Sequence, residues 1–302
     1  MSRVLKSRFA VISAALAVVS GLLLGGAGVA SAGTTPDDDP HVNIVGGHDP
    51  SQAYPFMSVI LNPSPKTGKQ IAYCGASLIA PQWVLTAGHC GMDFTAGITQ
   101  VRVGSANWKD GGTLTGITDI VQNPGWDYNE PGSDLSLIRL DQAVTQMPIA
   151  VPRNPGKVGA LERTIGFGAT CDYGSADWPC YPSGLQEAMV RLVNDSQCHW
   201  YDKSVELCVK GDKGQMACFG DSGGPLLRPV DVHDRRGKVH KEWQLVGVVS
   251  RDGDADADTN PTCSHGTGVY SDVTKYPDWI NRVISRDGYQ LNQSQAAYEL
   301  AG

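Results

Sequence analysis

The feature that most constrains the fold is a series of short segments, apolar or alternating in polarity, separated by glycine, proline, asparagine and aspartate. Such segments are typical of strands, and many of them at close spacing predict β-barrels or a β-sandwich. With 36 glycines and 18% charged residues, and no long helical periodicity through its middle, the chain favours a β-rich globular fold over a helical bundle. Strands are expected at residues 56–61, 73–79, 83–86, 101–103, 135–140, 164–167, 186–193, 225–227, 244–250 and 268–271.

One helix is expected near the C-terminus, because apolar side chains recur at helical spacing over residues 276–284. The residues that follow, 286–302, are expected to form a frayed tail. The charged segment 228–242 is expected to be a solvated hairpin without a role of its own.

Residues 1–32 have the pattern of a secretory signal. Basic residues stand near the start, an apolar run covers residues 9–24, and a small-residue cleavage site ends at Ala32. A membrane anchor is the alternative, but this run is short, and no later stretch is apolar enough to span a bilayer. Residues 33–43 are polar and rich in breakers, as in a short propeptide. We therefore expect a secreted protein whose folded part begins at Ile44.

Eight cysteines in an exported chain predict four disulfides. A metal site is the alternative, and it is disfavoured because no cysteine and histidine cluster has zinc-ligand spacing. The acidic run 252–258 offers oxygen ligands for calcium but lacks the EF-hand pattern, so a solvated acidic insertion is favoured. The net charge of −7 argues against nucleic-acid binding, which relies on clustered lysine and arginine.

Residues 220–225, with the sequence GDSGGP, form the stretch most typical of a catalytic centre. A serine hydroxyl becomes a useful nucleophile only when a neighbouring base takes its proton and backbone donors face the oxyanion. Glycines beside Ser222 allow a tight turn that brings the N–H groups of Gly220 and Ser222 toward one oxygen. A glycine-rich turn without catalytic role is the alternative. An α/β-hydrolase motif is excluded, because in that fold the acid and the histidine follow the serine.

The best candidates for the base and the acid lie earlier in the chain. His89 follows an expected strand in the segment 86–90, TAGHC, and imidazole can take and return a proton near neutral pH. Asp134 opens an expected strand, where a buried carboxylate must be paired, for example with an imidazole. Taken alone, the first could be a solvated histidine and the second a turn aspartate.

Four segments in this order resemble the signatures of secreted, bacterial-type serine proteases of the chymotrypsin and trypsin family. They are 44–47 (IVGG), 86–90 (TAGHC), 134–138 (DLSLI) and 220–225 (GDSGGP). The resemblance covers nearly everything from Ile44 to the C-terminal helix.

This resemblance implies that Ser222 is the nucleophile and His89 the base and then the acid, while Asp134 orients the imidazole. The N–H groups of Gly220 and Ser222 would form the oxyanion hole.

The resemblance also implies an all-β fold of two six-stranded antiparallel barrels with a C-terminal helix, the first within 44–151 and the second within 152–302, with the active site between them. Three disulfides are implied in the same way, and the two cysteines left over make the fourth. The pairs are Cys74 with Cys90, Cys218 with Cys263, Cys198 with Cys208, and Cys171 with Cys180.

Activation by cleavage is a further implication. In the family, a cut before the residue matching Ile44 frees an ammonium group that folds inward and pairs with the aspartate matching Asp221. Asn43 precedes the cut, where many relatives have arginine or lysine. An activating enzyme of trypsin-like preference is therefore not expected, and self-processing stays open.

Substrate preference is expected to depend on a pocket formed by Met216, Ser250 and Gly268. Met216 stands six residues before the serine, where trypsin-like members carry aspartate, so basic side chains would lack their main anchor. This predicts cleavage after uncharged, apolar residues. However, the sequence SRDG at 250–253 replaces the family's Ser-Trp-Gly wall, which leaves open that Asp252 reaches the pocket.

The expected function is that of a secreted, monomeric endopeptidase acting on proteins or peptides without cofactor or metal, with a protein inhibitor as a candidate partner. Neither nucleic acid nor a membrane is an expected partner. A non-catalytic binding protein on the same scaffold is the rival hypothesis, although such proteins usually lack a member of the triad. An ester as the natural substrate is equally compatible with this sequence.

Overall fold

The computed structural model describes residues 44–172, 179–212, 214–233, 236–255 and 262–293. The expected signal peptide and propeptide, the end of the acidic run and the last part of the expected tail lie outside these residues. In the part of the chain that is described, no helix is long and apolar enough to cross a membrane.

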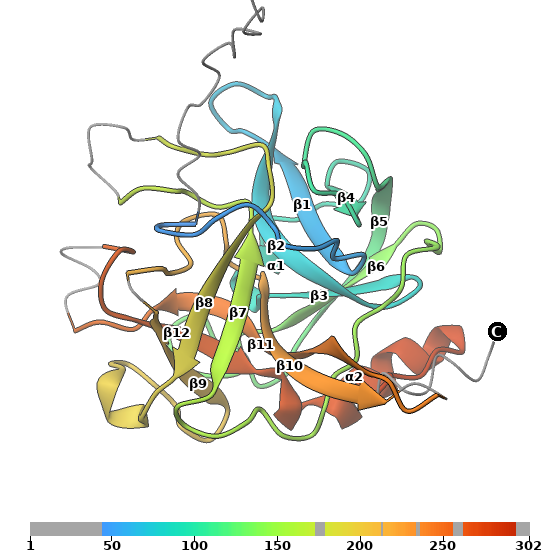
Figure 1. Ribbon diagram of the computed structural model, residues 1–302. Coiled ribbons are helices and arrows are strands. Elements are labelled where there is room, and N and C mark those ends of the chain that lie inside the picture. The colour runs from blue at the N-terminus through green and yellow to red at the C-terminus, as the bar shows by residue number, and fades with distance from the viewer. Residues whose placement is uncertain (1–43, 173–178, 213, 234–235, 256–261, 294–302) are drawn as a thin grey trace, which may run out of the picture. The chain divides into compact units, whose positions relative to one another are not determined.

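The first six strands close into an antiparallel barrel in the order β1-β2-β3-β6-β5-β4 (Figure 1). They are β1 (Met57–Pro63), β2 (Gln70–Ala80), β3 (Trp83–Thr86), β4 (Gln100–Val103), β5 (Thr113–Gln122) and β6 (Ser136–Leu140). β3 is antiparallel to β6, with Thr86 opposite Ser136. The chain that leaves β3 and the chain that enters β6 therefore meet at the same end of this barrel.

The other six strands close into a second antiparallel barrel in the order β10-β11-β12-β9-β8-β7. They are β7 (Leu161–Gly166), β8 (Gln186–Leu192), β9 (Glu206–Gly211), β10 (Pro225–His233), β11 (Val239–Asp252) and β12 (Thr267–Asp272). This arrangement confirms the expected fold class of two six-stranded barrels.

Two of these strands were not expected from the sequence pattern. β5 contains Gly116 and several polar residues, which weaken the apolar alternation that marks a strand. β9 begins with Glu206, a charged residue whose side chain is nevertheless buried. β10 and β11 extend beyond the expected strands 225–227 and 244–250 into the charged segment, where His233 pairs with Val239. The expected hairpin over residues 228–242 is therefore confirmed.

Five short helices of the described chain lie between or after the strands. They are α1 (Gly88–Gly91), η1 (Asp195–Gln197), η2 (Val273–Lys275), α2 (Pro277–Ile284) and η3 (Ser285–Asp287). The expected C-terminal helix is confirmed as α2, whose apolar face belongs to a core cluster shared by residues of both barrels.

The start of the expected frayed tail is in fact packed. Asp287 accepts hydrogen bonds from the indole of Trp83 at 2.9 Å and from Nε of Arg139 at 2.8 Å. Leu291 is buried, and the carbonyl of Asn292 accepts from the N–H of Val151. The residues just after the helix are therefore fixed by contacts with side chains of β3 and β6 and with the backbone of Val151.

Candidate active site

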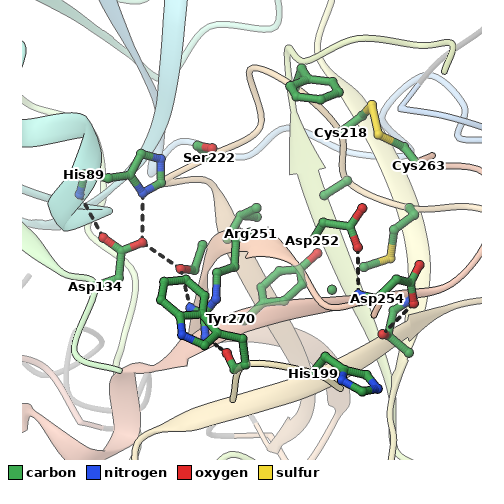
Figure 2. Close-up of a pocket in the computed structure, with 18 of the residues that line it drawn as sticks. His89, Asp134, His199, Cys218, Ser222, Arg251, Asp252, Asp254, Cys263 and Tyr270 are labelled. Carbon is green, nitrogen blue, oxygen red and sulfur yellow. Dashed lines mark hydrogen bonds and ion pairs between the residues drawn. A yellow bond between two sulfur atoms is a disulfide. The ribbon is translucent and has the colours of Figure 1, made fainter. Parts of the chain in front are cut away.

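A pocket lined by residues of both barrels contains the three candidate catalytic side chains (Figure 2). His89 and Asp134 come from the end of the first barrel where β3 and β6 meet. Ser222 lies in the turn that leads into β10. The strand order thus brings together residues that are far apart in the sequence.

Both the backbone and the ring of His89 are held by the carboxylate of Asp134. Its N–H donates to Oδ1 of Asp134, and Nδ1 of its ring lies 2.8 Å from Oδ2 of the same carboxylate. Cys90, the next residue, forms a disulfide with Cys74 of β2, which ties α1 to the barrel wall. The imidazole therefore has one edge fixed toward Asp134 and the other edge toward the pocket (Figure 2).

Asp134 is buried and has several partners. Besides His89, Oδ2 accepts a hydrogen bond of 2.6 Å from the hydroxyl of Ser250, and its carbonyl accepts one from Ser271. Burial would raise the pKa of Asp134, but the hydrogen bonds and charge of His89 and the hydroxyl of Ser250 together hold it below its usual value. This carboxylate is thus kept ionised beside the imidazole.

The turn that carries Ser222 packs directly on the first barrel. The N–H of Gly75 in β2 donates to the carbonyl of Ser222 at 2.7 Å. Gly223 adopts φ +80, and a Cβ there would overlap Oγ1 of Thr86 and the carbonyl of Gly75. Only glycine fits this close approach, which seats Ser222 beside the chain that leads to His89.

Ser222 lies beyond the edge of the imidazole that faces away from Asp134 (Figure 2). Within the described residues its hydroxyl makes no hydrogen bond to His89, so the candidate nucleophile and the candidate base share a pocket without being joined. The N–H groups of Gly220 and Ser222 donate to no other described group, and Gly220 adopts φ +91. Both donors are therefore available to an incoming oxygen.

Asp221 points away from this pocket into the protein. It is 0% exposed, and its carboxylate accepts hydrogen bonds from the N–H groups of Gly168 at 2.8 Å and Cys218 at 2.9 Å. Burial raises the pKa of Asp221 to about 7, although both donors act in the opposite direction. Among the described residues no cation pairs with it, so this carboxyl group is a buried acid without a counter-charge.

The segment that begins at Ile44 lies on the same part of the second barrel. Ile44 is 0% exposed, and Val45 clusters with Ala169 and Cys218. The carbonyl of Val45 accepts from the N–H of Met216 at 3.1 Å. Ile44 is thus buried near the backbone that binds Asp221.

The expected specificity residues Met216, Ser250 and Gly268 also line the pocket. Met216 is 5% exposed, and its terminal methyl group packs against Gly268, where a Cβ would overlap it. The hydroxyl of Ser250 is committed to Asp134. Asp252 reaches the pocket lining too, and its carboxylate accepts from the N–H of Asp254 at 2.8 Å.

The sequence analysis missed several residues of the pocket, and for Arg251, part of the segment 250–253, it missed the contacts. Arg251 forms an ion pair with Glu206 and stacks over Trp200, while Trp126 and Tyr128 line the side of the first barrel. No local pattern marks them, because each gains its place only when separate loops meet.

The four disulfides join the expected pairs, three of them implied by the resemblance and Cys171 with Cys180 left over. The pairs are Cys74 with Cys90, Cys171 with Cys180, Cys198 with Cys208, and Cys218 with Cys263. One group of potential metal ligands occurs among the described residues, formed by Cys74, His89 and Cys90. Because both of its sulfurs belong to a disulfide, neither can be a thiolate ligand. This group does not fit a metal ion.

Comparisons with known proteins place the chain among related sequences. The family model described as Trypsin matches residues 44–280. Trypsin delta of Drosophila melanogaster is 31% identical over 221 residues, which cover 68% of this chain and 77% of the relative. Trypsin 5G1 of Aedes aegypti is 30% identical over 70% of this chain and 75% of its own length. Tryptase of Mus musculus is 30% identical over 71% of this chain and 80% of its own length.

These relatives are animal proteins, so the bacterial type that the motifs resemble stays a prediction. The match begins at Ile44 and includes His89, Asp134 and Ser222. The chain therefore belongs to the trypsin family of serine endopeptidases.

Proposed function

We propose that this protein is a secreted endopeptidase that hydrolyses peptide bonds through an acyl-enzyme on Ser222. The observation that supports this most is the pairing of His89 with the buried Asp134 beside a serine turn whose N–H donors are free of other described partners.

In the proposed reaction, His89 takes the proton of the Ser222 hydroxyl while the oxygen attacks the substrate carbonyl. The N–H groups of Gly220 and Ser222 stabilise the negative charge that forms on the carbonyl oxygen. His89 then gives its proton to the leaving amine. A water molecule then attacks the acyl ester on Ser222, again with His89 as base and then acid. Asp134 holds the imidazole in the required orientation throughout.

Activation is proposed to depend on Ile44 and Asp221. A cut between Asn43 and Ile44 would create an ammonium group on a residue that is already buried near the backbone around Asp221. This cation would supply the counter-charge that the buried carboxylate lacks. The start of the family match at residue 44 supports the same boundary.

The proposed preference is for uncharged, apolar residues before the cut bond. The base of the pocket is formed by Met216 against Gly268, near the ring of Tyr270, and offers no charge to a lysine or arginine. Asp252 is the competing anchor for a basic side chain. Protein or peptide substrates, a monomeric state, secretion and a protein inhibitor as partner belong to the same proposal.

One experiment tests this function and its rivals. The precursor is produced with a specific cleavage sequence in place of residues 40–43, cut before Ile44, and assayed on matched peptide and ester panels beside Ser222→Ala. We expect peptide hydrolysis in the cut form alone and none in Ser222→Ala. Ester hydrolysis without peptide hydrolysis would identify an esterase, and no turnover in the cut form would favour a binding protein. Strong cleavage after arginine or lysine would refute the role given to Met216.

A further inference from the structure

Arg251 lies in the active-site pocket, yet the reaction proposed above does not use it. Its side chain is only 19% exposed, because its guanidinium group is turned toward Glu206, which is buried in the second barrel. Nη1 donates to Oε1 of Glu206 at 2.6 Å and Nη2 to Oε2 at 2.9 Å. The guanidinium also stacks over the indole of Trp200, 4.7 Å from its centroid. Arg251 is therefore held in one orientation.

A chain of hydrogen bonds leads from Arg251 to the catalytic aspartate (Figure 2). Nη1 of Arg251 also donates to the hydroxyl of Ser250, at 3.1 Å. A hydroxyl group has one hydrogen, and here that hydrogen goes to Oδ2 of Asp134, at 2.6 Å. The same carboxylate oxygen faces Nδ1 of His89. By occupying a lone pair of Ser250, Arg251 fixes which way that hydroxyl points.

The partner of Arg251 acts on the same aspartate by a second route. Oε1 of Glu206 accepts the N–H of Gly132, two residues before Asp134, at 2.9 Å. Gly132 adopts φ +103 and Ser133 adopts φ +53, and a serine rarely takes that conformation unless its surroundings impose it. The second barrel therefore anchors the loop that delivers Asp134 to the first barrel's active-site edge.

We propose that the Arg251–Glu206 ion pair is a clamp that positions Asp134 for catalysis, through Ser250 on one side and Gly132 on the other. Both are positioning residues, since neither touches the reacting atoms. This inference rests on the proposed function, because it assumes that Asp134 orients His89 during turnover.

The geometry favours this role over direct substrate binding. Both terminal nitrogens of Arg251 are committed to Glu206, and only its Nε lacks a partner among the described residues. An acidic substrate side chain would have to displace a buried carboxylate that also accepts hydrogen bonds from the N–H groups of Gly132 and Asp202.

The test compares Arg251→Lys, Ser250→Ala and the double variant in the cut enzyme. Lysine keeps a positive charge for Glu206, but its single ammonium group cannot serve both carboxylate oxygens and Ser250 in the fork geometry of arginine. We expect kcat to fall about 10- to 100-fold with KM changed less than about threefold, because the loss is one of orientation. In the Ser250→Ala background, Arg251→Lys should lower kcat by less than about threefold, because the route through Ser250 is already cut and the lysine keeps the positive charge beside Glu206, which holds Gly132.

Arg163→Lys is the matched control. Arg163 pairs with the buried Glu187 at 3.1 Å and stacks over Trp243 at 4.6 Å, in the same barrel but outside the pocket lining. The Arg163→Lys variant should lose about as much thermal stability as Arg251→Lys and keep the kcat of the parent enzyme. If Arg251→Lys does not fold, the Arg251→Gln, Glu206→Gln variant replaces the ion pair by a neutral amide pair, and the same loss of kcat is expected.

The outcomes separate this inference from the proposed function. Active-site titration of the cut parent enzyme that shows no acyl-enzyme burst defeats the proposed function itself. A normal burst in the parent, with unchanged kcat in Arg251→Lys, defeats only the clamp. A raised KM for acidic peptides at constant kcat would show instead that Arg251 binds substrate. Equal losses of kcat with and without Ser250 would overturn the proposed route through Ser250.

Discussion

The substitution Asp221→Asn should change the stability of the uncut and the cut chain in opposite directions. In the uncut chain the carboxyl group is 0% exposed, and its described partners are the N–H groups of Gly168 and Cys218. In the cut chain, we propose, the ammonium group of Ile44 becomes its partner. Asp221 therefore lowers the stability of the folded chain before cleavage and raises it afterwards.

The size of the first effect follows from the pKa of the buried acid. Burial raises the pKa of Asp221 from 3.8 to about 7. Between these values the folded chain keeps the proton that the unfolded chain releases, so stability falls as the pH rises from about 4 to about 7 and is then constant. The loss amounts to about 4 kcal/mol at pH 8.

Asparagine cannot ionise, but its amide hydrogens would face one of the two N–H donors, at a cost of about 1–3 kcal/mol. The uncut Asp221→Asn chain should therefore be about 1–3 kcal/mol more stable than its parent at pH 8. At pH 4 this advantage should disappear.

After cleavage the sign should invert. Removing one partner of a buried ion pair costs about 3–5 kcal/mol, so the cut Asp221→Asn chain should be less stable than its parent by about that amount. The activity of the cut Asp221→Asn chain should fall more than about 100-fold, because the turn that carries Ser222 would no longer be ordered by the ion pair between Asp221 and the ammonium group of Ile44.

Urea unfolding of both forms at pH 4 and pH 8 measures these differences, with Ser222→Ala in every chain to prevent self-cleavage. Asp278→Asn is the control, because Asp278 is exposed and its effect should be small and equal in both forms. An Asp221→Asn effect of the same sign in the cut and the uncut chain would refute the reasoning.

Three further outcomes are expected. Gly223→Ala should displace the turn that carries Ser222 and lower kcat at least about 100-fold. Gly237→Ala is the control, because Gly237 also has positive φ but a Cβ there would meet open space, and it should cost only about 1 kcal/mol of stability. Active-site titration and thermal unfolding compare the two variants. Met216→Asp should transfer the preference toward lysine and arginine on a peptide panel, and an unchanged profile would show that this residue does not form the pocket base. Replacing Cys74 and Cys90 by alanine should cost about 2–4 kcal/mol and lower kcat, because α1 would no longer be tied to β2; an unaltered kcat in the folded variant would argue against that support.

Much of the fold could be predicted because its signals are local. The apolar strand residues and the α2 periodicity are visible in any short window of sequence. β5 was missed because Gly116 interrupts its pattern, and β9 because Glu206 looks like a surface residue until Arg251 neutralises it. The packing of residue 291 could not be foreseen either, since it depends on Asn281 from the preceding helix.

The candidate site divides in the same way. The triad candidates lie in compact motifs, so their residue types and order were enough to propose them. The contacts that support them join segments far apart in the chain, such as Gly75 to Ser222 and Glu206 to Gly132. Such contacts leave no periodicity and no spacing, and only the closed barrels bring them into view.

The most direct test of the central claim is covalent labelling of the form cut before Ile44 with a sulfonyl fluoride, followed by peptide mass spectrometry. We predict a single adduct on Ser222, formed at a rate that falls at least about 100-fold in His89→Ala, because the base is then missing. An adduct on another residue, or an equal labelling rate without His89, would contradict the account.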